Sequence, residues 1–272
     1  MKHWTLDDIE WARFDPAKVD SEILKVIKAA SLVEHNGRDY AAYLCNVFAD
    51  DPGFQDIARE WAEEEVQHGQ ALGRWAQIAD PGFDFAASLR RFTDGYKLPL
   101  DARESVRGTR AGELVARCIV ETGTSSYYSA LADAVEEPVL RQICKQIAGD
   151  EFRHYRLFYT HMNRYLERDR IGRLRRLAVV LGRINESEDD ELAYAYYAAN
   201  TPSDAPYDRR RYSRAYARRA YGLYRPSHVE RAMGMCFKAA GIDGKQGLRR
   251  LLSGLTYRLM SARATRLARA NA

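Results

Sequence analysis

The chain has 272 residues, of which 46% are hydrophobic and 29% charged, proportions typical of a folded protein with one large or two small domains. Its four cysteines, none spaced as CxxC, argue against a disulfide framework and a four-cysteine metal site, so we expect buried free thiols. The net charge of +4 conceals an asymmetry, because residues 205–272 hold 14 Arg and 2 Lys against 2 Asp and 1 Glu, which leaves the remainder acidic.

The opening sequence MKHWTLDDIEWARFD carries acidic residues where a signal peptide needs an apolar stretch. No uninterrupted apolar run approaches the roughly 20 residues that span a bilayer. We therefore expect a cytoplasmic protein without an integral membrane segment.

Apolar residues recur at helical spacing along most of the chain, and alternating β patterns are absent. The motifs DDPGF at 50–54 and DPGF around Pro81 are predicted stops, because Pro and Gly disfavour helix continuation. Pro138 suits the start of a helix. The predicted helices are 20–48, 55–79, 107–134, 137–168, 170–184, 188–200, 227–240 and 245–269.

The segment NTPSDAPYD, residues 200–208, is predicted as a linker because it is rich in Pro, Asp and Ser. It divides the chain into a helical bundle over residues 1–200 and a basic Arg/Tyr-rich helical extension over residues 201–272. The extension contains the sequence RRRYSRAYARRAYGLYRP. An acidic body and a basic tail indicate two roles rather than one uniform surface.

Two Glu-x-x-His motifs occur in the chain, one in WAEEEVQH at residues 61–68 and one in GDEFRH at 149–154. Residues three apart on a helix project from the same face. A further glutamate precedes each motif among apolar or small neighbours, 31 residues earlier in the first case and 30 in the second. The resulting set is Glu34, Glu65, His68, Glu121, Glu151 and His154.

Two such helical hairpins predict a four-helix bundle whose interior receives four carboxylates and two imidazoles. Carboxylates forced together in a low-dielectric core repel one another unless cations are present. One glutamate on each of two helices, with Glu-x-x-His on each of the other two, is the ligand set of di-iron and di-manganese carboxylate bundles. A single such motif could be a surface accident, but the matched pair favours a dinuclear metal site. Glu63 and Glu64 are expected to face water.

At these residues the sequence resembles the ferritin-like di-iron carboxylate superfamily, and within it the soluble acyl-carrier-protein desaturases. WAEEEVQHGQALGRW resembles their helix of the form W-x-x-E-E-N-R-H-G-D-L-L, although Gln67 stands where that family has arginine. LRQICKQIAGDEFRHYRLFYTHM resembles their Q-I-C-x-x-I-A-x-D-E-x-R-H-x-x-x-Y. The resemblance covers roughly residues 20–170, and implies a ferritin-like four-helix bundle with additional C-terminal helices.

The resemblance implies that the six residues of the set ligate two iron ions, with manganese or a mixed iron–manganese pair as alternatives. It also assigns catalytic roles to Thr124, matching a threonine that assists oxygen activation, and to Asp150, matching an acidic residue that supports a histidine ligand. Gly37, Gly69 and Gly123 lie near ligands, and either leave room for a substrate channel or allow close helix packing. Tyr127 and Tyr128 are either packing residues, which we favour, or redox-active.

The function implied is an oxygen-dependent di-iron oxidoreductase that desaturates or hydroxylates an organic substrate, either a small molecule or an acyl chain on a carrier. Such an enzyme needs an external electron donor, and the resemblance fits a homodimer. The alternative is a ferroxidase or a rubrerythrin-like peroxidase in iron or oxidative-stress handling, because the same ligands serve both functions.

For the basic tail, the favoured role is pairing with the acidic body to close the fold. Docking of an acidic carrier or partner, contact with an anionic membrane and binding of nucleic acid are alternatives, with nucleic acid the least favoured.

Overall fold

The computed structural model describes residues 3–186, 190–202, 204–242 and 246–269. Within these ranges every regular element is a helix and no strand occurs, so the predicted all-α class is confirmed. Three short 3₁₀ helices come first, η1 (Leu6–Asp8), η2 (Trp11–Arg13) and η3 (Pro16–Lys18). The α-helices are α1 (Ser21–His35), α2 (Gly37–Val47), α3 (Pro52–Ala79), α4 (Phe85–Gly95), α5 (Arg110–Ala134), α6 (Pro138–Asp169), α7 (Arg173–Asn185), α8 (Asp190–Asn200), α9 (Arg209–Tyr221), α10 (Pro226–Ala240) and α11 (Gln246–Arg269).

The first predicted helix, 20–48, is in fact two helices. At Asn36 the backbone N–H bonds the carbonyl of Val33, three residues back, and α1 ends one residue earlier. Asn and Gly are both weak helix formers, so the Asn36–Gly37 pair is a natural place for the chain to bend. The bend brings α2 onto α3, where a Cβ at Gly37 would lie 2.5 Å from the Cβ of Glu65.

The predicted stop at DDPGF is confirmed, since α2 ends at Val47, but α3 begins at Pro52, within the motif, instead of at residue 55. Pro52 occupies the first helical position, and the Asp51 side chain accepts a hydrogen bond from the backbone N–H of Phe54. The second stop is confirmed, since α3 ends at Ala79 just before Pro81. Helices α4 and α9 were not predicted. Of the predicted helical residues, 188, 189 and 245 lie outside the described part of the chain.

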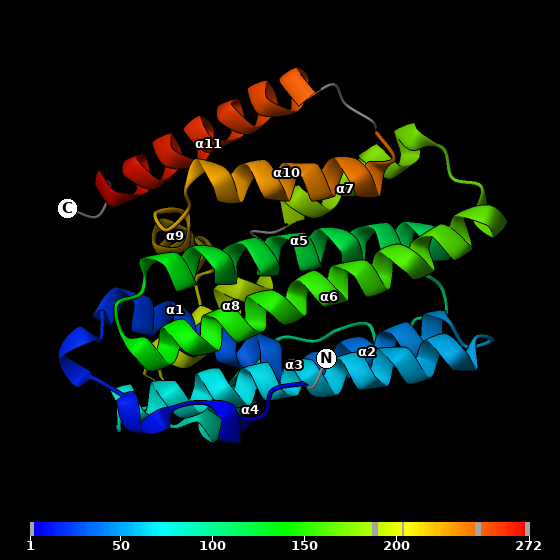
Figure 1. Ribbon diagram of the computed structural model, residues 1–272. Helices are drawn as coiled ribbons and strands as arrows, with labels where there is room; N and C mark the ends of the chain where they lie inside the picture. The colour runs from blue at the N-terminus through cyan, green and yellow to red at the C-terminus, as the bar shows by residue number, and fades with distance from the viewer. Residues whose placement is uncertain (1–2, 187–189, 203, 243–245, 270–272) are drawn as a thin grey trace.

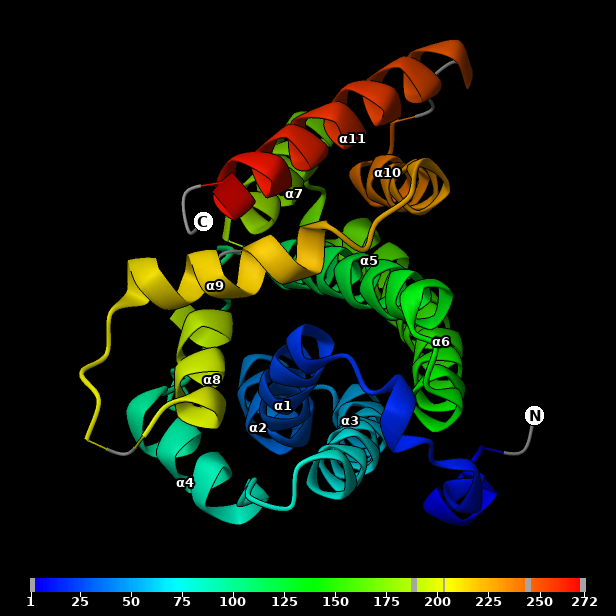
Figure 2. The same cartoon turned by 90° about the vertical axis from the view of Figure 1, so that its left-hand side faces the viewer.

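The long helices pack in pairs (Figure 1). Helix α5 lies along α6, and α1 lies along α3. Contacts between α3 and α6 join the two pairs, and α8 covers α1. Viewed end-on, α1 has α3, α6, α5, α9, α8 and α4 arranged around it (Figure 2).

The N-terminal segment closes the seam between α3 and α6. The Gln67 side chain of α3 donates to the carbonyl of Trp4, and Gln142 of α6 donates to the carbonyl of Asp8. The backbone N–H of Glu10 donates in turn to the Gln142 side chain. The two bonds to Gln142 join residues more than 130 positions apart in the sequence.

The buried apolar residues form two clusters that share the long helices α3, α5 and α6, to which the first adds α1 and the second adds α2. One cluster includes Leu72 of α3, Leu131 of α5 and Ile147 of α6. The other includes Trp61 of α3 and Phe158 of α6, at the opposite ends of those helices. On α3, α5 and α6 the candidate ligands lie between residues of the two clusters, and Glu34 lies near the end of α1, before α2 enters the second cluster. The polar residues therefore form a layer with apolar packing on both sides.

The C-terminal helices pack on the long helices and on each other. Helix α9 contacts α8, α10 contacts α5, and α11 lies on α9 and α10. Between Asn200 and Arg209, the described residues of the predicted linker contain no helix. The division into parts 1–200 and 201–272 stays a prediction.

The four cysteines are free, with three buried and Cys45 partly exposed. In the described part of the chain, no helix combines the length and the apolar character that a membrane crossing requires.

Candidate metal centre

The structure brings together all six residues of the predicted ligand set, and all six are buried. Their ligand atoms form two overlapping groups, in each of which the atoms lie within 4.8 Å of one another. Glu65 and Glu151 belong to both groups, one from α3 and one from α6. The first group is completed by Glu34 and His68, and the second by Glu121 and His154. Buried carboxylate and imidazole groups so arranged can hold a metal ion.

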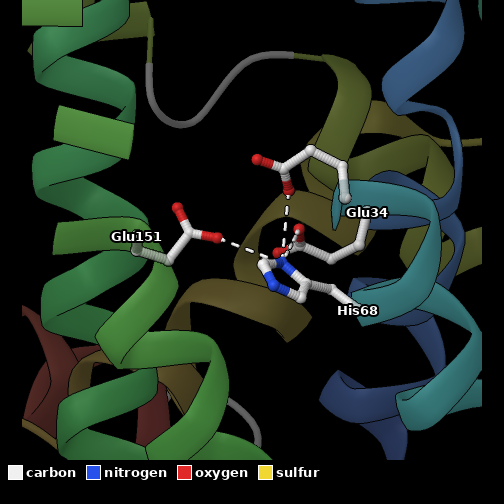
Figure 3. A group of neighbouring side chains, drawn as sticks. Glu34, His68 and Glu151 are labelled. Carbon is white, nitrogen blue, oxygen red and sulfur yellow. Dashed lines mark ion pairs between the residues drawn. The ribbon is translucent and has the colours of Figure 1, made fainter. Parts of the chain in front are cut away.

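Both histidines direct the Nδ1 atom at the carboxylates. His68 Nδ1 lies 3.4 Å from Glu65 Oε2, 3.4 Å from Glu151 Oε1 and 3.7 Å from Glu34 Oε2. Figure 3 shows Glu34 and Glu151 reaching the His68 ring from different sides. Neither His68 Nδ1 nor Glu151 Oε1 forms a hydrogen bond, although both are buried.

The second histidine is arranged in the same way. His154 Nδ1 lies 3.1 Å from Glu65 Oε1, 3.8 Å from Glu121 Oε2 and 4.0 Å from Glu151 Oε2, and it also forms no hydrogen bond. Buried polar atoms without a partner are rare in proteins, and an ion is one recognised explanation. The two Nδ1 atoms and Glu151 Oε1 therefore fit a bound cation.

The Nε2 atoms of both rings face carboxylates outside the ligand set. His68 Nε2 lies 3.0 Å from Asp150 Oδ2, and His154 Nε2 lies 3.1 Å from Glu64 Oε2. A carboxylate at Nε2 holds the proton there and leaves Nδ1 able to bind a metal. The expectation that Glu64 faces water is therefore wrong, because its side chain turns back to His154 and Arg153. Glu63 is exposed and pairs with Arg38.

Further side chains orient these supporting carboxylates. The indole Nε1 of Trp4 donates to Asp150 Oδ2 at 2.7 Å, and the Trp4 ring stacks parallel to the His68 ring. Arg153 donates to Asp150 Oδ1 and to Glu64 Oε2. One arginine therefore links the supports of both histidines.

Two hydroxyl groups contact the candidate ligands directly. The Thr124 hydroxyl on α5 donates to Glu151 Oε2 on α6, so this residue lies at the centre, as expected. The Tyr128 hydroxyl donates to Glu34 Oε1 at 2.6 Å. Tyr128 was expected to serve packing, and its bond to Glu34 adds a polar role to its buried position.

Arg117, which sequence reasoning missed, places a fixed positive charge at one end of the centre. Its Nη2 donates to Glu121 Oε1 at 2.5 Å, and both side chains are buried. The guanidinium lies 4.6 Å from the centre of the Trp61 ring and 5.2 Å from that of Phe158. Arg117 and Glu121 lie four residues apart on α5, and this spacing is the only signal in the sequence that their side chains meet.

Without a cation, the electrostatics of the cluster keep protons bound. Burial and the nearby Glu65 carboxylate raise the pKa of Glu34 to about 8. Burial likewise raises the pKa of Glu121, despite Arg117, and the pKa of Glu151. Burial opposes ionisation of Glu65 too, but contacts with His154 and His68 hold its pKa well below the usual value.

The histidines respond in the opposite sense. Burial lowers the pKa of His68, but its contacts with Asp150 and Glu151 outweigh burial and raise it well above the usual value. The same holds for His154, through Glu64 and Glu65. Protons thus occupy the cluster where divalent cations would otherwise balance the carboxylates.

The three glycines near the centre differ in their surroundings. A Cβ at Gly69 would lie 2.5 Å from the backbone nitrogen of His35, and one at Gly37 would meet Glu65 just as closely. Both glycines therefore allow close approach of helices, the packing alternative considered above. No atom lies within 4 Å of a Cβ at Gly123, so this position has open space beside it.

A small cavity of about 70 Å³ adjoins the candidate ligands. Its wall includes the apolar side chains of Val33, Trp61 and Val120 beside polar and charged ones, namely Glu34, Glu65, Glu121, Glu151, Thr124, Tyr40, Arg117, Arg183 and Glu191. The cavity is much smaller than the roughly 300–1,000 Å³ of pockets that enclose drug-sized ligands.

No protein-family model matches the chain, and no curated protein matches it.

Proposed function

We propose that the protein is a di-iron oxidoreductase of the ferritin-like superfamily, which uses O₂ to oxidise a small organic substrate. The observation that carries the proposal is the pair of overlapping buried groups, each of three carboxylates and one imidazole, with Glu65 and Glu151 common to both. Their origin on α1, α3, α5 and α6 supports a ferritin-like four-helix bundle. Manganese or a mixed pair of metals would use the same residues.

In this proposal Glu34 and His68 would hold one metal and Glu121 and His154 the other, and Glu65 and Glu151 belong to both groups of candidate ligands. When bound, the two irons supply the redox chemistry that activates oxygen. The apolar clusters on either side keep water from the centre. Each Nε2 proton is held by Asp150 or Glu64, so the imidazoles keep one orientation.

Thr124 and Tyr128 are the residues placed to hold protons at the carboxylates. The Thr124 hydroxyl donates to Glu151, one of the carboxylates shared by both groups. Tyr128 donates to Glu34, which belongs to one group alone. Arg117 offsets the charge of Glu121.

The cavity beside the centre supports a small substrate. Its volume gives no support to the long acyl chain that the sequence resemblance implies. The electron donor and the proposed carrier or homodimer partner likewise remain expectations from that resemblance.

The same cavity favours a second candidate function, a ferroxidase or rubrerythrin-like peroxidase. Ferrous iron and hydrogen peroxide are small and polar, and a cavity of about 70 Å³ can admit either of them. The two functions differ in what is consumed, because only the first requires an organic substrate.

The test is single-turnover oxidation by iron-loaded protein. The reduced protein is mixed with O₂ or hydrogen peroxide, in the presence or absence of short acids, aldehydes and acyl carriers, and products are identified by mass spectrometry. An oxidised organic product supports the oxidase, whereas rapid peroxide consumption or iron oxidation without one supports the second candidate. Protein that consumes neither oxidant contradicts both. Glu65→Gln should lose the activity and Glu63→Gln should keep it, because Glu63 is exposed and outside the centre.

A further inference from the structure

Helix α11 turns an apolar stripe toward the solvent instead of toward the protein. The stripe consists of Leu248, Leu251, Leu255 and Leu259, which are between 50% and 69% exposed. Their spacing of three, four and four residues places them on one helix face. On the opposite face, Ser253 is buried and donates a hydrogen bond to the carbonyl of Arg249. A contiguous exposed apolar face of this kind marks an interaction site.

Arginines without acidic partners lie on or beside the same face. Arg266 follows Leu248 by 18 residues, which is about five helical turns, and so continues the line of the stripe. Arg258 lies beside Leu259, and Arg269 follows on the same side of the helix. Within the described part of the chain, Arg258, Arg266 and Arg269 have no acidic side chain within ion-pair distance.

The positive charge of α11 indicates which kind of partner could cover this face. Helix α11 contains six arginines and no acidic residue. A second copy of α11 placed against the first would bring like charges together, which opposes self-association. A partner with an apolar interior and a negatively charged surface would contact the leucines through the first and the arginines through the second.

We propose that α11 docks the protein on an anionic phospholipid surface, with the four leucines entering the boundary of the acyl chains and the arginines contacting lipid phosphates. The helix lies at the outer edge of the molecule, on α9 and α10 (Figure 2). The candidate metal ligands lie on α1, α3, α5 and α6. Docking through α11 therefore leaves the metal centre unchanged, and the two proposals can fail independently.

The experiment is flotation of the full chain with vesicles of phosphatidylglycerol and phosphatidylcholine, compared with vesicles of phosphatidylcholine alone. At about 0.1 M salt the protein floats with the anionic vesicles and not with the neutral ones. Raising the salt weakens the binding, because screening removes the attraction between arginines and lipid phosphates.

Variants separate the two parts of the contact. Leu251→Ser with Leu255→Ser weakens vesicle binding by more than about tenfold, because two apolar side chains no longer enter the lipid. Arg258→Gln with Arg266→Gln weakens it by about fivefold per arginine. The matched control, Ile78→Ser with Val106→Ser, also removes two exposed apolar side chains and leaves binding unchanged. Circular dichroism and thermal unfolding of each variant establish that it is folded.

Three results would overturn the proposal. The first is a wild-type protein that does not float with anionic vesicles. The second is a leucine variant that binds as tightly as the wild type, which would reduce the contact to non-specific charge. The third is a protein that does not bind vesicles but associates through α11 with a second copy or with an acidic protein, and loses that association in the leucine variant.

Discussion

His68 and Asp150 are joined across the interface of α3 and α6, with Nε2 of the imidazole 3.0 Å from Oδ2 of the carboxylate. Asp150 immediately precedes Glu151 in the second Glu-x-x-His motif. The reciprocal contact joins His154 to Glu64, which immediately precedes Glu65 in the first. Each motif thus supplies a glutamate and a histidine as candidate ligands. The acidic residue just before that glutamate contacts Nε2 of the histidine in the other motif.

This reciprocity predicts similar effects for Asp150→Asn and Glu64→Gln. Either change removes the negative charge that holds the Nε2 proton, so we expect metal affinity to fall by about 10–100-fold. Competition with a chromogenic chelator measures the change. The control is Glu63→Gln, which removes a neighbouring carboxylate paired with Arg38 on the surface. Equal affinities for Glu64→Gln and Glu63→Gln would contradict the assigned support of His154.

The metal-free protein should lose stability as the pH rises from 4.5 to about 8. Glu34 titrates near 4.5 when unfolded and near 8 when folded, so the folded chain binds more protons in this range. This contribution to the stability of the folded protein is fully present below pH 4.5, and it is lost as the pH rises through about 8. The raised pKa values of His68 and His154 act in the same direction.

Urea unfolding of chelator-treated protein across this range checks the prediction. We expect the free energy of unfolding to fall by at least about 2 kcal/mol. Glu34→Gln should flatten the profile, and added metal should restore stability at the higher pH because its binding replaces protons. A metal-free protein that gains stability from pH 4.5 to 8 would contradict the electrostatic account.

Gly69→Ala and Gly123→Ala should have opposite consequences. The added methyl group at Gly69 would meet the backbone of His35, which cannot move without separating α1 from α3. We expect a loss of about 1–3 kcal/mol and weaker metal binding. Gly123 has open space around it, so alanine should be neutral or stabilise the helix by up to about 1 kcal/mol. Thermal unfolding compares the two variants, and equal destabilisation would argue against the close contact at Gly69.

Arg117→Met tests whether arginine substitutes for metal charge at Glu121. Where Glu121 is ionised, removing its partner from this buried ion pair costs about 3–5 kcal/mol, so the metal-free variant should be clearly less stable at a pH above the raised pKa of Glu121. Metal should then stabilise the variant more than the wild type, because Glu121 no longer shares its charge with a fixed cation. Thermal melts with and without metal measure the difference. A smaller metal-induced gain in the variant would contradict this role.

The candidate ligands could be predicted because their signal is local and repeated. Glu65 and His68 share a helix face by spacing alone, and the second motif repeats the pattern with an upstream glutamate at nearly the same separation. Glu64 could have been found by the same symmetry, since it stands before Glu65 as Asp150 stands before Glu151. The expected surface position of Glu64 ignored this correspondence.

Other parts of the centre have no local signal. Trp4 reaches Asp150 across 146 residues of sequence, and only the folded N-terminal segment brings them together. The bend at Asn36 depends on how α2 meets α3. Periodicity predicted a helix at α11, but it could not indicate that the leucine face points outward, because helical spacing does not specify which face is packed.

The most direct test of the account is the metal content per chain of the purified protein and of Glu121→Ala, with Glu63→Ala as the control. The account predicts about two transition-metal ions per chain in the wild type and the control, and fewer in Glu121→Ala. The absence of bound transition metal from all three proteins after loading with ferrous or manganous ions would contradict it.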